Sequence, residues 1–207
     1  MKIFYFDTET TGLQSYKHAI IQLAYIIEID GAAKECGNLL IQPYPYDVIE
    51  MAALAINRRS LSEIFVPPFI TPQEAYKQLI SVLDKYVDKY DSQDKFYPAG
   101  YNVSFDCDFL AAFFRKNNNT FFASYFHFLK IDPSSALLLL GKPELPNYKL
   151  ATVCRHYGIE INAHDALGDI RATCELIRQI RNGAEQITAI LQSIRAELSK
   201  AEADLTT

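Results

Sequence analysis

The sequence predicts a single α/β domain in which helices flank a mixed β-sheet. The first 42 residues hold three apolar, β-rich stretches separated by turn signals. From residue 72 onward, strand-like stretches alternate with helical patterns, which is the order typical of α/β proteins. With 207 residues, of which 49% are hydrophobic, the chain can build one sizeable core.

The first third predicts an antiparallel meander. Residues 2–7 form a short apolar run with aromatic side chains, which indicates a buried strand. Residues 18–30 predict a second strand, which the hairpin turn signal Asp30-Gly31 closes. Residues 35–42 predict the third strand.

The middle of the chain alternates between helix and strand. Residues 50–56 have a helical composition, and a helix begins at Pro72 and is expected to end near Tyr90. Residues 96–103 predict a fourth strand and residues 105–116 a helix that three asparagines end. Residues 121–132 predict a short helix followed by a fifth strand, HFLKID.

The C-terminal third predicts helices at 134–140, 149–157 and 166–180. Gly183 predicts a break, so we expect a domain of residues 1–182 and a helical tail of residues 183–207. The tail has an amphipathic pattern, which suits either a helix packed on its own domain or a docking helix or dimer seam. Its apolar residues are Ile187, Ile190, Leu191, Ile194 and Leu198.

Composition excludes several classes of protein. The chain has no long apolar run, which excludes a membrane span, and no signal-peptide pattern, so we expect a cytoplasmic protein. The four cysteines lack the spacing of a zinc site, so we expect them to pack as small apolar side chains. Because the net charge is −5 and no basic stripe is present, any nucleic acid must be bound locally, through metal ions or with a partner's help.

Two acids end the first strand. Asp7 and Glu9 are two residues apart, so their side chains share one face of the strand. Close carboxylates repel each other unless a cation lies between them, and oxygen ligands favour Mg²⁺ or Mn²⁺. The alternative is a pair of solvated acids.

Two further acidic clusters lie where helices begin. Asp106 falls in the first turn after the fourth strand, and Asp169 lies one turn into the helix that Asp165 is expected to cap. His164 precedes this helix on a loop, where an imidazole can take a proton from water. Each also has a structural interpretation, as a helix-start acid or a surface histidine.

Together, the stretches FDTETTG (6–12), NVSFD (102–106) and HDALGD (164–169) resemble the three motifs of the DEDDh exonucleases. This family is also called DnaQ-like, after the proofreading epsilon subunit of bacterial DNA polymerase III. The resemblance covers about residues 1–180. It implies a ribonuclease H-like fold with a five-stranded mixed sheet. It also implies hydrolysis of terminal phosphodiester bonds from the 3′ end, with release of nucleoside 5′-monophosphates.

The resemblance also assigns roles to residues. The four metal-binding acids correspond to Asp7, Glu9, Asp106 and Asp169, which would hold two divalent cations, Mg²⁺ or Mn²⁺, and the general base corresponds to His164. All five are catalytic residues in this interpretation. Substrate contacts fall on Glu9, Thr10, Thr11, Leu13 and Asn57, although Leu13 is equally suited to core packing. Asn57 stands where many relatives carry a histidine, which puts the contacts of the terminal nucleotide there in doubt.

Several alternatives stay open at this point. The implied partners are single-stranded or frayed 3′ ends of nucleic acid and, in a proofreading role, a DNA polymerase subunit. An exoribonuclease of the oligoribonuclease or RNase T kind would carry the same motifs. A non-catalytic, polymerase-associated module is the rival of another class, and we expect it to have lost one of the five residues.

Overall fold

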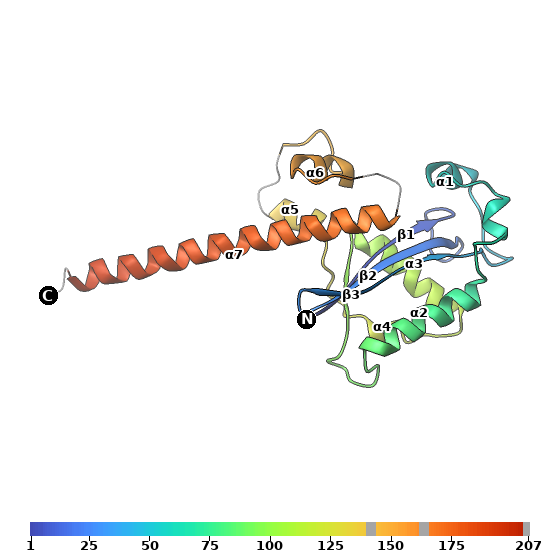
Figure 1. Cartoon of the computed structure of the whole chain (residues 1–207), viewed down its shortest axis with the longest axis horizontal. Helices are drawn as coiled ribbons and strands as arrows, with labels where there is room; N and C mark the ends of the chain where they lie inside the picture. The colour runs from blue at the N-terminus through green and yellow to red at the C-terminus, as the bar shows by residue number, and fades with distance from the viewer. Residues whose placement is uncertain (140–143, 162–165, 205–207) are drawn as a thin grey trace.

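The computed structural model describes residues 1–139, 144–161 and 166–204 (Figure 1). Within them lies a four-stranded sheet of order β3-β2-β1-β4. The strands are β1 (Lys2–Thr10), β2 (Ile20–Ile29), β3 (Ala32–Leu40) and β4 (Tyr97–Ala99). The first three pair antiparallel, and β4 runs parallel to β1, which confirms the predicted meander and the mixed sheet.

The predicted fifth strand and the five-stranded sheet are wrong for the described residues. Residues 126–131 pass along the outer edge of β4 but form only two isolated bridges there, Phe126 with Phe96, which precedes β4, and Ile131 with Ala99. Between these bridges the chain bends outward, and Phe128 is 80% exposed. The reason lies in β4, which is only three residues long and has Pro98, a residue without a backbone N–H, at its centre.

The helices are α1 (Met51–Ile56), α2 (Pro72–Tyr86), α3 (Val103–Lys116), α4 (Phe122–Tyr125), α5 (Pro133–Leu139), α6 (Leu150–His156) and α7 (Ala166–Asp204), with a 3₁₀ turn η1 (Glu63–Phe65). Each helix expected from the sequence is present. Helix α2 begins at Pro72 as predicted, and the Thr71 hydroxyl accepts the Glu74 N–H, but the helix ends at Tyr86 rather than Tyr90.

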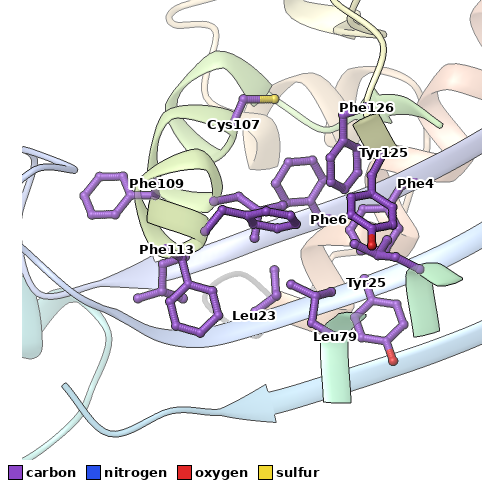
Figure 2. Close-up of a cluster of buried hydrophobic side chains, with 14 of the residues drawn as sticks. Phe4, Phe6, Leu23, Tyr25, Leu79, Cys107, Phe109, Phe113, Tyr125 and Phe126 are labelled. Carbon is purple, nitrogen blue, oxygen red and sulfur yellow. The ribbon is translucent and has the colours of Figure 1, made fainter. Parts of the chain in front are cut away.

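Two hydrophobic layers enclose the sheet. On one face, Phe4 and Phe6 of β1 pack with residues of α2 and α3 in an aromatic core (Figure 2). On the other face, Ile3 and Tyr5 pack against α7. The phenylalanine-rich stretch at 113–128 mainly fills the first layer, although Phe121 and Phe128 are exposed. The two layers place α3 and α7 on opposite sides of β1.

Helix α7 runs without interruption through Gly183, so the predicted break is wrong, and the proposed boundary at residue 182 lies inside one helix. Its second half projects beyond the sheet (Figure 1). Ile187, Ile190, Leu191 and Ile194 are 47–58% exposed there, so this part of the tail does not pack on its own domain. Among the described helices, none combines the length and apolar character needed to cross a bilayer.

Candidate functional site

The C-terminal half of β1 presents two carboxylates toward α7. Asp7 and Glu9 have the same parity along the strand as Ile3 and Tyr5, which contact α7. Both acids are partly buried. Asp7 also lines a small hollow between the ends of β1 and β4 and the start of α7, together with Gly100 and Thr173.

The third carboxylate comes from the opposite layer. Asp106 lies in the first turn of α3 and is 4% exposed. One of its oxygens, Oδ1, accepts two hydrogen bonds from Thr8, from the backbone N–H at 2.9 Å and from the hydroxyl at 2.6 Å. Because Thr8 points to the face opposite Asp7 and Glu9, it ties α3 to the strand that carries both acids.

Gly100 allows α3 to begin so close to β1. A Cβ atom at this position would lie 2.8 Å from the carbonyl oxygen of Phe6, which is too close for any side chain. The chain therefore turns tightly after β4, and α3 starts beside the end of β1. Asp106 then falls on the buried stripe of α3, one turn after Val103 and one turn before Phe109.

The fourth carboxylate, Asp169, lies in the first turn of α7. It is on the side of the helix that packs on the sheet, because Ala166 and Thr173, which lie three residues before and four residues after it, are buried. The helices on the two faces of the sheet thus each contribute one acid, α3 contributing Asp106 and α7 contributing Asp169. Both acids come to the end of β1, the strand that carries the other two.

Electrostatic interactions link Asp7 and Glu9 to Asp106 and Asp169. Burial raises the pKa of Asp7 well above its usual range, and the charges of Asp106, Glu9 and Asp169 raise it further. Burial, Asp169 and Asp106 raise the pKa of Glu9 to about 7, against a lowering effect of Arg59. Burial also raises the pKa of Asp106 to about 7, although the hydrogen bonds from Thr8 oppose this.

This cluster is suited to a hard cation but is not a finished cage. Within the described residues, no three His, Cys, Asp or Glu side chains are already arranged as a metal-ligand group. Asp106 directs Oδ1 to Thr8, and uncompensated carboxylates repel one another. The all-oxygen donor set and the raised pKa values of Asp7 and Glu9 fit a site whose ligands would draw together around divalent ions.

Most of the predicted substrate residues lie at the end of β1 and just after it. Thr10 and Thr11 are buried, whereas Leu13 is 79% exposed, which excludes the core-packing interpretation of Leu13. Asn57 donates a hydrogen bond from Nδ2 to the carbonyl oxygen of Thr10 at 2.9 Å, so α1 contacts this segment. His164 and its neighbour Asp165 lie outside the described residues.

The sequence interpretation missed Thr8. It could have been found, since it stands between the two acids and must face the opposite side of the strand. The sequence interpretation of the pair Arg58-Arg59 allows contact with phosphate but favours solvated surface, whereas the charge of Arg59 opposes the rise in the pKa of Glu9. Its guanidinium also contacts Glu63 at 3.1 Å and lies over the ring of Phe69.

Comparison with known proteins agrees with this geometry. The RNase T exonuclease family model matches residues 4–177. The chain is 27% identical over 186 residues to the PolC-type DNA polymerase III of Bacillus subtilis, a match that covers 87% of this chain and 12% of that protein. The chain thus corresponds to a small part of that polymerase.

Solved structures of Escherichia coli exonuclease I have the same fold. The complex with a dT13 oligonucleotide aligns with a TM-score of 0.74 at 21% identity, over 92% of this chain and 43% of that one. The complex described as ExoI/SSB-Ct aligns with a TM-score of 0.72 at 19% identity, over 93% and 43% of the two chains. This chain spans less than half of exonuclease I.

The family model covers most of the chain, and the matched residues include Asp7, Glu9, Asp106 and Asp169. The fold agrees, with helices on both faces of a mixed sheet. The chain therefore belongs to the RNase T exonuclease family, a DnaQ-like family of the ribonuclease H-like superfamily.

Proposed function

We propose that this chain is a metal-dependent 3′–5′ exonuclease that releases nucleoside 5′-monophosphates from single-stranded or frayed 3′ ends. The observation that carries the proposal is the convergence of four carboxylates at one end of the sheet, where the other acids raise the pKa values of Asp7 and Glu9. A cluster of this kind is unfavourable for the fold alone, because each buried carboxylate opposes the ionisation of the others. Membership of the exonuclease family supports the same conclusion.

Asp7, Glu9, Asp106 and Asp169 would hold two divalent cations, Mg²⁺ or Mn²⁺. Such a pair supplies positive charge where the attacking and leaving oxygens carry negative charge. The protein's own contribution is to deliver the ligands from both layers of the fold. Thr8 keeps Oδ1 of Asp106 in place through two hydrogen bonds.

We assign the remaining steps to residues on either side of the acids. His164 would accept a proton from the attacking water. At the same time the oxygen of that water would bond to the phosphorus of the terminal nucleotide. The bond from phosphorus to the 3′ oxygen of the preceding nucleotide then breaks, and that oxygen gains a proton. Glu9 and the amides of Thr10 and Thr11 would receive the terminal 3′-hydroxyl. Leu13, whose side chain is exposed, would contact the last base.

We propose single-stranded DNA as the substrate and a DNA polymerase as a partner. The exonuclease I neighbours include complexes with DNA oligonucleotides, and the relative in Bacillus subtilis is a polymerase. An exoribonuclease would use the same acids. Parallel digestion of DNA and RNA strands of one sequence separates the two substrates. All four carboxylates are present, which argues against a non-catalytic module.

A comparison of two acids on α3 tests the proposal. Asp106 is buried in the acidic cluster, whereas Asp108, two residues later, is exposed. Asp106→Asn should lower the rate of nucleotide release by at least about 10²-fold, because even substitutions behind metal ligands cost 10–100-fold. Asp108→Asn should stay within about twofold.

The assay uses a 5′-labelled single strand with Mn²⁺ and resolves products by length. A ladder that shortens one nucleotide at a time from the 3′ end, and disappears with a chelator, is the expected result. Wild-type turnover by Asp106→Asn, or cleavage inside a strand whose 3′ end is blocked, contradicts the proposal.

A further inference from the structure

The segment Glu9–Leu13 leaves the sheet at an irregularity. The pairing of β1 with β2 shifts register between Glu9 and Thr10, so the regular ladder is interrupted beside the proposed catalytic acid before Thr10 pairs with Ile20. Bulges of this kind change the direction of side chains and interrupt ladder hydrogen bonds. The conformation of Glu9–Leu13 therefore depends on contacts from outside the strand.

Thr11 and Gly12 are held by the loop that leads to α1. The Thr11 hydroxyl donates to the carbonyl of Val48 at 2.7 Å, and the Glu50 N–H donates to the carbonyl of Thr11 at 2.8 Å. Gly12 lies against the ring of buried His18, where a Cβ atom would meet the imidazole at 2.4 Å. Glu50 in turn lies 2.9 Å from Nε2 of His18.

Thr10 is held by Asn57. The side-chain amide of Asn57 reaches the Thr10 carbonyl from the C-terminal end of α1, at 2.9 Å. The backbone at Asn57 is well anchored. The Asn57 N–H donates to the carbonyl of Ala53, and the Arg59 N–H donates to the carbonyl of Leu54, a fully buried residue. A rigid helix end therefore supports the residue next to Glu9.

We propose that Asn57 is a positioning residue: through the Thr10 carbonyl it holds Glu9–Leu13 in the conformation that reads the terminal 3′-hydroxyl. This inference rests on the proposed function. It places Asn57 behind the segment that meets the substrate rather than in contact with the substrate. The partly buried amide supplies the one side-chain hydrogen bond to the Thr10 carbonyl among the described residues.

The chemistry of the amide provides matched variants. Asn57→Leu has a similar shape and no donor, and Asn57→Asp replaces the donor by an acceptor that repels the carbonyl. In Asn57→His, the Nδ1 atom occupies the position of the amide nitrogen and can carry a proton, so a donor is retained. Asn118→Asp, at an exposed position beyond the end of α3, controls for the added charge.

The readout is a ratio that the fraction of folded enzyme cannot change. We measure kcat/KM for single strands that end in a 3′-hydroxyl and in a 3′-phosphate. The preference is the ratio of the value for the 3′-hydroxyl strand to that for the 3′-phosphate strand. Asn57→Leu and Asn57→Asp should lower this ratio by about tenfold, the size expected when a hydrogen bond is lost and the segment Glu9–Leu13 is misplaced. The preference of Asn57→His should stay within about threefold of the wild-type value. The preference of Asn118→Asp should equal the wild-type value.

Amide hydrogen exchange in residues 10–13 provides a second measurement that does not require activity. Exchange should become faster in the Leu and Asp variants and remain slow in the His variant. An unchanged preference together with unchanged exchange in Asn57→Leu overturns the inference. If the wild type releases no nucleotides, the proposed function fails, and the exchange data alone decide whether Asn57 positions the segment.

Discussion

Thr8 shows how one side chain can join the two layers of this fold. It stands between Asp7 and Glu9 in the sequence, but its hydroxyl and N–H both face Asp106 on α3. Hydrogen bonds to a carboxylate favour its charged form, so Thr8 works against the rise in the pKa of Asp106 that burial causes. The balance leaves the pKa at about 7.

Thr8→Val tests this role at the residue level. The variant retains the backbone N–H but loses the hydroxyl donor, so the pKa of Asp106 should rise further. Because the ionised carboxylate is the form that holds a cation, the acidic limb of the kcat/KM profile should move up by as much as about one pH unit.

The comparison is with Thr120→Val, which changes an exposed threonine beyond the end of α3. Both pH profiles are recorded with saturating Mn²⁺. Superimposable acidic limbs for wild type and Thr8→Val would show that the hydroxyl does not tune Asp106.

At the level of elements, α7 has two parts with different environments. Ala166, Ile170, Cys174 and Ile177 cover the sheet, whereas Ile187, Ile190, Leu191 and Ile194 are exposed to solvent. Gly183 lies near the transition, and a Cβ atom there would meet nothing within 4 Å. Its helical conformation costs backbone entropy without a packing contact in return.

Gly183→Ala should therefore stabilise the exposed half of α7 by about 0.8 kcal/mol. Slower amide exchange in residues 184–196 and a higher helical content by circular dichroism are the measurements. Gly158→Ala is the control with the opposite expected effect on stability. Gly158 follows α6 with a φ of 69°, and alanine is strained in that conformation. Faster exchange around residue 183 in Gly183→Ala would contradict the expectation.

At the level of the whole molecule, the site is built at the expense of stability. Glu9 and Asp106 each have a pKa of about 7 in the folded chain, well above the values in an unfolded chain, and that of Asp7 is also raised. A folded state that binds more protons than the unfolded state is most stable below the unfolded pKa. It loses that stability as the pH rises through the folded pKa.

With a chelator present, the melting temperature should therefore fall between about pH 4.5 and pH 7.5, by on the order of 5 °C. Mg²⁺ or Mn²⁺ should raise it more at pH 8 than at pH 5, because ions bind the deprotonated cluster. Differential scanning calorimetry measures both effects. Asp106→Asn should flatten the pH dependence, and a wild-type melting temperature that rises steadily over this range would contradict the assignment.

Much of the fold could be predicted because its signals are local. The meander follows from apolar runs and the Asp30-Gly31 turn, and α2 follows from Pro72 and its apolar spacing. The failures have local causes that sequence patterns do not show. Residues 127–132 look like a strand, yet β4 offers too short a partner, and Gly183 is tolerated because α7 is already nucleated on the sheet.

By itself, the sequence determined the layer order of the fold and the four acids, because side-chain parity on a strand and position in a first helical turn are consequences of backbone geometry. Only the tertiary structure decided what supports those acids. The bond from Thr8 to Asp106 spans 98 residues and that from Asn57 to Thr10 spans 47. Contacts of such range arise from the packing of whole helices against the sheet, and no local pattern of residues encodes them.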